Sequence, residues 1–137
     1  MKRSIILSAG LALIGTTALA ASSDLMTSVP ASSLTVTDWY KQDVYDPSNA
    51  KIGEVMDVLI GPSGQVSSVI VGVGGFLGAG EKDVAVSFNA IKKATKNDKV
   101  YLTMDTTKDA LRHAPGFKYD SAKTTWVPDA SNNNGKS

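Results

Sequence analysis

Apolar and polar residues alternate with a period of two in this chain, and that pattern most constrains its fold. Val84, Val86 and Phe88 are separated by Ala85 and Ser87, and the segment Val100–Met104 repeats the alternation. Successive side chains of a strand point to opposite faces, so each segment predicts a strand that is buried on one face. The alternation therefore favours an all-β fold.

Two further apolar segments predict a hairpin. Ile52–Ile60 carries apolar side chains on both parities, which predicts a strand covered on both faces or a β-bulge that shifts its register. A Gly-Pro-Ser-Gly turn follows at 61–64, and the β-branched segment Val66–Val73 comes directly after it. Upstream, Leu34–Val44 predicts a first strand or a short helical turn. Several short strands with turn signals between them predict a small barrel or sandwich.

One short helix is expected after the strands. Thr106 is the predicted N-cap, and Asp109 stands three residues later as its capping-box partner. Pro115 and Gly116 are expected to end the helix. We expect Leu111 to pack against the barrel.

The first twenty residues have the pattern of a secretory signal peptide. Lys2 and Arg3 precede the apolar run Ile5–Ile14, and Ala18-Leu19-Ala20 supplies small residues at the cleavage site. The apolar run is shorter than the ~20 residues that span a bilayer. We predict cleavage after Ala20 and a periplasmic location, with an uncleaved anchor as the alternative.

The remaining chain divides into three parts by composition. Residues 21–33 are rich in serine and predict a flexible linker. Residues 34–112 hold the apolar patterns and predict one folded domain. Residues 113–137 end in a polar stretch with little to bury, so we expect a mostly disordered C-terminal tail.

Charge and composition exclude several classes of function. Without Lys2 and Arg3 the fourteen basic residues fall to twelve, against thirteen acidic residues, so the mature chain sits near −1. A nearly neutral chain has no electrostatic footprint for nucleic acid. The chain has no cysteine and one histidine, so neither a disulfide framework nor a structural zinc site is expected.

A set of motifs resembles the PRC-barrel domain family over about Leu34 to Met104. The motifs are, in chain order, the hairpin strand Lys51–Ile60, the turn Gly61–Gly64, the strand Val69–Val73, the loop Gly74–Gly80 and the strand Val84–Phe88. The resemblance implies a small β-barrel with one short C-terminal helix, used as an interaction or assembly module and not as an enzyme. Together with the export signal, it indicates a stand-alone exported bacterial member of the family.

The glycine-rich loop is the first candidate site, formed by Gly74, Gly75, Phe76, Leu77 and Gly78. No helix follows the loop, so it lacks the helix N-terminus with which glycine-rich loops bind phosphates. Its glycines are expected to adopt positive φ. Phe76 and Leu77 are expected to cap the barrel, with a protruding partner-binding tip as the alternative.

Aromatic residues form the second candidate site, a patch of Trp39, Tyr40 and Tyr45 that either packs or stacks on a ligand. Asp57 is expected to accept hydrogen bonds within the fold, and His113 is expected to lie on the surface. No Gly-x-Ser-x-Gly nucleophile motif is present. We therefore expect no catalytic residue, no bound metal and no cofactor.

The alternation also assigns inward and edge positions. We expect inward side chains at Val58, Ile70, Val84, Val86 and Leu102. The segments around Thr35–Trp39 and Lys99–Met104 are predicted to be sheet edges, through which the chain would form a weak homodimer.

These observations predict a non-catalytic periplasmic interaction or assembly module that acts through the barrel surface. Its partner would be an envelope protein or a second copy of the chain. One alternative is a protein peripherally associated with the envelope membrane through the leader or the glycine loop. A second alternative is a hydrolase or another enzyme of unknown substrate.

Overall fold

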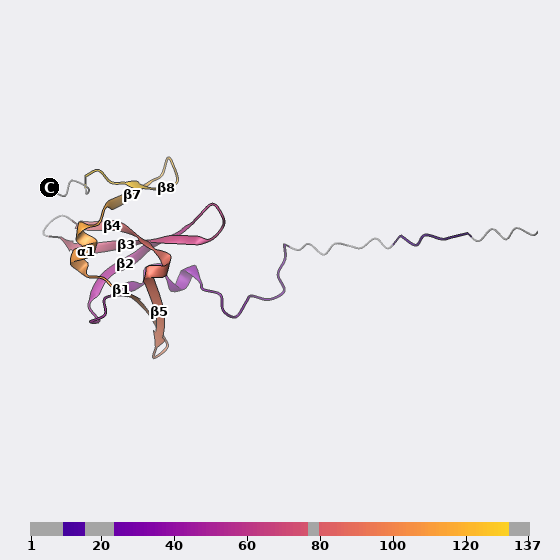
Figure 1. The fold of residues 1–137 in the computed structure, drawn as a ribbon, viewed down its shortest axis with the longest axis horizontal. Coiled ribbons are helices and arrows are strands. Elements are labelled where there is room, and N and C mark those ends of the chain that lie inside the picture. The colour runs from indigo at the N-terminus through magenta and orange to yellow at the C-terminus, as the bar shows by residue number, and fades with distance from the viewer. Residues whose placement is uncertain (1–9, 16–23, 77–79, 132–137) are drawn as a thin grey trace, which may run out of the picture. The chain divides into compact units, whose positions relative to one another are not determined.

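The computed structural model describes residues 10–15, 24–76 and 80–131, with side chains left out for residues 75–80. The chain divides into a unit that ends at Ser33 and a compact unit that begins at Leu34. Figure 1 shows the second unit as a curved sheet with one short helix beside it. Among the described residues, no helix combines the length and the apolar character needed to cross a bilayer.

The described residues form one eight-stranded sheet in the order β5-β6-β1-β2-β3-β4-β7-β8. The strands are β1 (Asp43–Tyr45), β2 (Lys51–Ile60), β3 (Val66–Phe76), β4 (Gly80–Ser87), β5 (Ile91–Lys96), β6 (Lys99–Met104), β7 (Gly116–Asp120) and β8 (Thr125–Pro128). Neighbouring strands are antiparallel except for β1 and β6, which pair in parallel. The predicted all-β, barrel-like fold is confirmed.

The predicted hairpin is β2 and β3. Its turn contains Gly64 at a φ of +81°, a conformation that glycine adopts without a steric penalty. The β2–β3 register shifts between Val55 and Asp57 and again between Leu59 and Ile60. These irregularities confirm the predicted bulge, because each one moves the apolar residues of β2 to the other parity.

The short helix α1 (Lys108–His113) begins one residue later than expected. Thr107 is its N-cap, and the Thr107 hydroxyl oxygen accepts a hydrogen bond from the Ala110 amide at 3.0 Å. The predicted N-cap Thr106 instead lies in the turn that leaves β6, where its amide donates to the Met104 carbonyl at 2.9 Å. Leu111 is buried in the core, as predicted.

Two 3-10 helices complete the described elements. The first, η1 (Val36–Asp38), lies within the segment for which a first strand or a helical turn was expected. The second, η2 (Phe88–Ala90), follows β4. Both alternatives for Leu34–Val44 therefore occur in turn, since β1 begins at Asp43 shortly after η1.

Aliphatic side chains from the inner face of the sheet form the core. Val69 pairs with Val86 and Val71 with Val84, so these residues share one face of β3 and β4. The buried cluster consists of Trp39, Val44, Ile52, Val55, Val69, Val71, Val73, Val84, Ile91, Leu102 and Leu111. Of the predicted inward residues, Val84 and Leu102 are fully buried, and Val58 and Val86 are half-buried against the cluster.

Ile70 is buried on the other face of β3, so its predicted inward position is wrong. Its neighbours Val69 and Val71 point into the cluster, and the strand alternation turns Ile70 away from it. Ile70 pairs in register with Asp57, and the Trp126 indole N–H donates a hydrogen bond to Asp57 Oδ2 at 2.8 Å. Trp126 therefore reaches the outer face next to Ile70.

A hairpin, β7 and β8, occupies part of the expected disordered tail. β7 pairs with β4 at Asp83–Phe117 and Val84–Gly116, and the rings of Tyr119 and Trp126 meet edge to face at 5.8 Å. The expectation of disorder is wrong for residues 116–128 because aromatic side chains replace the aliphatic ones that usually signal a buried strand. Residues 132–137 lie outside the described part of the chain.

The predicted sheet edges also differ from the observed ones. Lys99–Met104 is β6, which lies inside the sheet between β5 and β1. Thr35–Trp39 contains η1 and is not a strand. The strands at the ends of the sheet are β5 and β8.

Candidate binding surface

The described part of the glycine loop does not have the expected backbone. Gly74, at the end of β3, does not have a positive φ, and a Cβ built on it would meet open space. The prediction of positive φ is therefore wrong for Gly74. The side chain of Phe76 and all of Leu77 and Gly78 lie outside the described residues, as does the surrounding of Gly75. The capping of the barrel by Phe76 and Leu77 stays a prediction.

The predicted aromatic patch separates into three environments. Trp39 is 4 % exposed in the core, with its ring 4.7 Å from that of Phe88. Tyr40 is exposed, with the Lys41 ammonium 5.5 Å from its ring centre. Tyr45 contacts Tyr101 on β6, with ring centres 5.9 Å apart. The patch does not form as predicted because Trp39 packs inward while Tyr45 extends from the outer face of β1.

The outer face of β1, β6 and β5 brings together residues from both ends of the domain. Val44 of β1 pairs with Leu102 of β6, and both point into the core. Tyr45 and its register partner Thr103 consequently point outward. On β5 the same face carries three further residues, because the register places Lys92 opposite Thr103, Ala94 opposite Tyr101 and Lys96 opposite Lys99.

A hollow of about 430 Å³ opens beside the Tyr45–Tyr101 pair, lined by Lys41, Gln42, Asp43, Tyr45, Lys99, Val100 and Tyr101. Asp43 forms an ion pair with Lys51 at 2.8 Å. This carboxylate accepts a hydrogen bond from the Lys51 ammonium and thereby raises the Lys51 pKa. The Tyr45 hydroxyl lies 3.5 Å from the other Asp43 oxygen. One end of the hollow is therefore neutralised.

Lysines dominate the other end of this surface. Lys92, Lys96 and Lys99 are exposed, and none of them takes part in an ion pair with a described residue. Lys93, on the opposite face of β5, pairs with Asp38 at 2.6 Å and lowers the Asp38 pKa. We call Lys92, Lys96 and Lys99, together with Tyr45 and Tyr101, the basic face.

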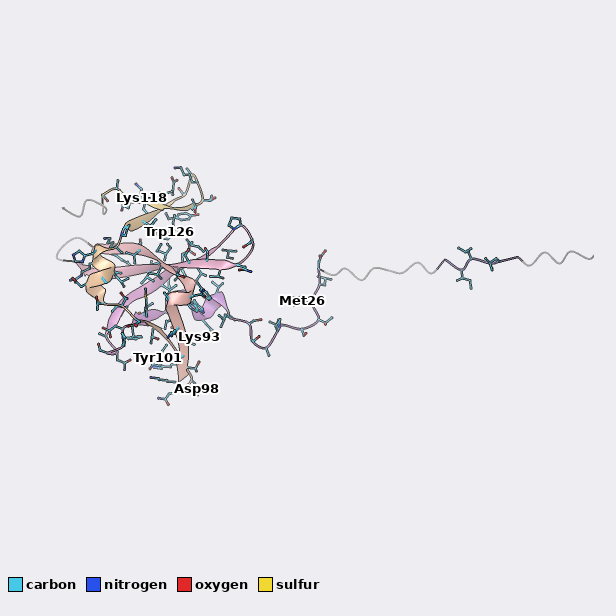
Figure 2. The ribbon with its side chains drawn as sticks, viewed as in Figure 1. Met26, Lys93, Asp98, Tyr101, Lys118 and Trp126 are labelled. Atoms are coloured by element: carbon cyan, nitrogen blue, oxygen red, sulfur yellow. The ribbon has the colours of Figure 1, made fainter. Side chains whose placement is uncertain are left out.

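The basic face lies at one end of the domain. Figure 2 shows Asp98 at the tip of the β5–β6 hairpin with Tyr101 and Lys93 nearby, and Lys118 and Trp126 on the far side. Asp98 is the acidic residue of the turn between Lys96 and Lys99. The surface is basic even though the whole chain is nearly neutral, because Asp98 is the one acidic residue of the β5–β6 hairpin, and the nearby Asp38 and Asp43 are paired with other lysines.

A second hollow of about 440 Å³ has mixed charge, lined by Lys51, Ile52, Gly53, Glu54, Gly72, Gly74, Glu81 and Lys108. Asp83 lies on the same strand as Glu81, and its buried Oδ1 has no hydrogen-bond partner. Loss of hydration, with a contribution from the Glu81 charge, raises the Asp83 pKa. Among the described residues, no three His, Cys, Asp or Glu side chains gather as a metal site.

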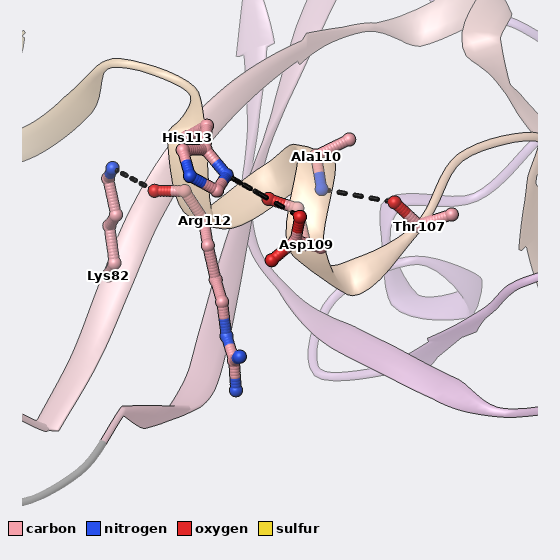
Figure 3. Close-up of polar contacts among 6 residues, drawn as sticks. All are labelled: Lys82, Thr107, Asp109, Ala110, Arg112 and His113. Carbon is pink, nitrogen blue, oxygen red and sulfur yellow. Dashed lines mark hydrogen bonds and ion pairs between the residues drawn. The ribbon is translucent and has the colours of Figure 1, made fainter.

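The remaining polar candidates hold the fold together. Asp57 accepts hydrogen bonds from the Trp126 indole and from the Val58 amide, both at 2.8 Å. His113 is exposed at the end of α1, with Nδ1 2.8 Å from the Asp109 carbonyl oxygen (Figure 3). The Lys82 ammonium donates to the Arg112 carbonyl at 2.7 Å and attaches α1 to β4. Both Asp57 and His113 are placed as the sequence predicted.

A curved sheet that surrounds a buried, mostly aliphatic core defines a small β-barrel module. The family model of the PRC-barrel domain matches residues 33–111, more than half of the chain, so the chain belongs to the PRC-barrel domain family. This family consists of small modules for binding or assembly. No curated protein matches the chain. The β7–β8 hairpin follows the matched segment.

Proposed function

We propose that this chain is a non-catalytic interaction module that works in the bacterial periplasm, where its barrel surface binds an envelope protein. The observation that carries the proposal is the filled interior of the barrel. Val44, Val71 and Leu102 meet there without exposed surface, so a partner has access only to the exterior. The hollow beside Tyr45 and Tyr101 offers such an exterior site.

The sequence supports the periplasmic part of this proposal. Lys2 and Arg3, the apolar run Ile5–Ile14 and the Ala18-Leu19-Ala20 motif have the order of a cleavable export signal. The chain has no cysteine and therefore no disulfide, so its stability does not depend on the redox state of the compartment.

Site-directed photocrosslinking in cells that express the full chain tests the proposal. A photoreactive phenylalanine analogue would replace one exposed residue at a time, at Ser67, Ala94 or Lys118. We expect a discrete crosslink to an envelope protein from one of these positions, recovered in the periplasmic fraction without a salt wash. Crosslinks from none of them, or recovery only in salt-washed membranes, would contradict the proposal.

A further inference from the structure

We propose that β5 binds an acidic peptide segment of the partner in extended conformation, which adds to the sheet as a ninth strand. The inference rests on the interaction role proposed above and names its surface and its partner chemistry. It follows from three features of β5 and its neighbours: an open backbone edge, two unpaired lysines on one face of β5, and a pair of tyrosines on the same face of β6 and β1.

The open edge follows from the geometry of the β5–β6 hairpin. Asn97 and Asp98 have φ values of 50° and 62°, as a two-residue type I′ turn requires. In such a hairpin the flanking pair, Lys96 and Lys99, exchanges both backbone hydrogen bonds, and every second pair does the same. Thr95 belongs to an intervening pair, so its N–H and C=O point away from β6.

The exposure of β5 agrees with this geometry. Ala94, Thr95 and Lys96 are exposed, and β5 stands at the end of the sheet order. The described backbone hydrogen bonds outside the strand pairs do not include Thr95. Figure 1 shows β5 extending away from the body of the domain. A peptide strand can therefore approach Thr95 from the open side.

Charge selects the composition of that strand. Lys92 and Lys96 point to the same face of β5 and lie about 14 Å apart along it. An added strand with carboxylates four residues apart places one opposite each lysine. Between them lies Ala94, whose register partner Tyr101 contacts Tyr45. An apolar residue midway between the two carboxylates fits this position.

The same lysines argue against a second copy of this chain as the occupant. In an antiparallel pairing of two β5 strands centred on Ala94, each Lys92 would face a Lys96. Like charges directly opposite each other destabilise a strand pair, and edge lysines are a common device against self-pairing. The lysines therefore disfavour pairing with a second β5 strand and favour pairing with an acidic strand.

An NMR titration of the purified chain tests the inference. The probe is a short peptide with the sequence Thr-Glu-Thr-Val-Thr-Glu-Thr. The control peptide has lysine at both glutamate positions. We expect the acidic peptide to shift the amide signals of Ala94–Lys96 and to slow hydrogen exchange at the Thr95 amide. The lysine peptide should leave these signals unchanged.

Variants separate strand addition from simple charge attraction. The double variant Lys92→Glu and Lys96→Glu should weaken peptide binding by about tenfold or more, whereas reversal of Lys118 and Lys123 on the opposite hairpin should have little effect. Thr95→Pro removes the outward N–H without breaking a bond to β6 and should also abolish binding. Thr95→Ala is its matched control.

Four outcomes would overturn the inference. The first is peptide binding that survives Thr95→Pro. The second is unchanged hydrogen exchange at the Thr95 amide of the wild-type chain at saturating peptide, which decides the case if the proline variant does not fold. The third is binding to vesicles of mixed phosphatidylcholine and phosphatidylglycerol that is tighter than binding to the acidic peptide, which would indicate that the basic face binds a lipid surface. The fourth is photocrosslinking from Ser67 or Lys118 but not from Ala94. It would exclude β5 as the binding site without contradicting the proposed interaction role.

Discussion

Gly53 lies where two strands leave no room for a side chain. A Cβ at this position would stand 2.6 Å from Val71 Cγ1 and 2.8 Å from the Gly72 carbonyl oxygen. Gly53→Ala should therefore lower the free energy of unfolding by about 1–3 kcal/mol, measured by urea denaturation. Gly74→Ala is the control, since open space surrounds that position. Equal stability of the two variants would show that the barrel accommodates the methyl group at Gly53.

Asp83 should make the stability of the domain depend on pH. Its folded-state pKa is raised from the ordinary 3.8, so the folded state binds the proton more tightly than the unfolded state. Stability should consequently fall as the pH rises from the unfolded pKa through the folded one. Asp83→Asn removes this loss and should raise the Tm at pH 7.

The same variant should match the wild type in acid. Below the pKa that Asp83 has in the unfolded state, its carboxyl group is neutral in both the folded and the unfolded chain. The Tm difference between wild type and Asp83→Asn should therefore shrink there. Calorimetry at several pH values measures this convergence. A constant Tm difference at every pH would mean that packing, and not ionisation, separates the two proteins.

Among the elements, the β7–β8 hairpin has a narrow attachment, because it pairs with β4 at two positions. The hydrogen bond from Trp126 to Asp57 adds to that attachment. Trp126→Phe keeps an apolar ring but removes the donor, and should cost about 1–2 kcal/mol of unfolding free energy. Tyr119→Phe, at an exposed ring of the same hairpin, should be close to neutral.

A double-mutant cycle assigns the cost to the hydrogen bond. If the indole N–H acts through Asp57, then Trp126→Phe should add little destabilisation to a chain that already carries Asp57→Ala. Hydrogen exchange should show faster opening of β7 in either variant. Fully additive losses in the cycle would mean that the two residues stabilise the domain separately.

Local signals made the central elements predictable from the sequence. The β2–β3 hairpin has a glycine turn between two β-branched segments, and β4 and β6 alternate clearly, so their burial patterns follow from nearby residues. β5 and the β7–β8 hairpin lack such signals. In β5 one apolar residue, Ile91, is buried, and lysines fill most other positions. These strands form because each pairs with the backbone of a neighbouring strand, and no local sequence pattern indicates that pairing.

The candidate surface was hidden for a related reason. Tyr45 meets Tyr101 because β1 pairs in parallel with β6, although the two tyrosines are far apart in the sequence. The basic face adds lysines from β5, whose register with β6 places them on the outer side. The nearly neutral net charge of the chain conceals this local excess. To predict this surface from the sequence, one would have needed to know that β1 pairs with β6 and in which register.

For the whole molecule, processing is the first property to test. The Ala18-Leu19-Ala20 motif predicts that the exported chain begins at Ala21, because small residues occupy the positions that signal cleavage requires. Intact-mass analysis of the chain recovered from the periplasm measures this directly. A mass that still includes Met1 and Lys2 would indicate an uncleaved anchor and redirect the functional proposal toward the membrane.

The parallel pairing of β1 with β6 also governs the order in which the domain can assemble. Hairpins such as β2–β3 and β5–β6 join neighbouring segments and close short loops, whereas Val44 finds Leu102 only after the whole intervening chain is present. Synthesis delivers β1 first and β6 much later, so the ladder cannot close while the chain is incomplete. If the chain is exported as we propose, this delay would favour passage through a translocation channel before the domain folds.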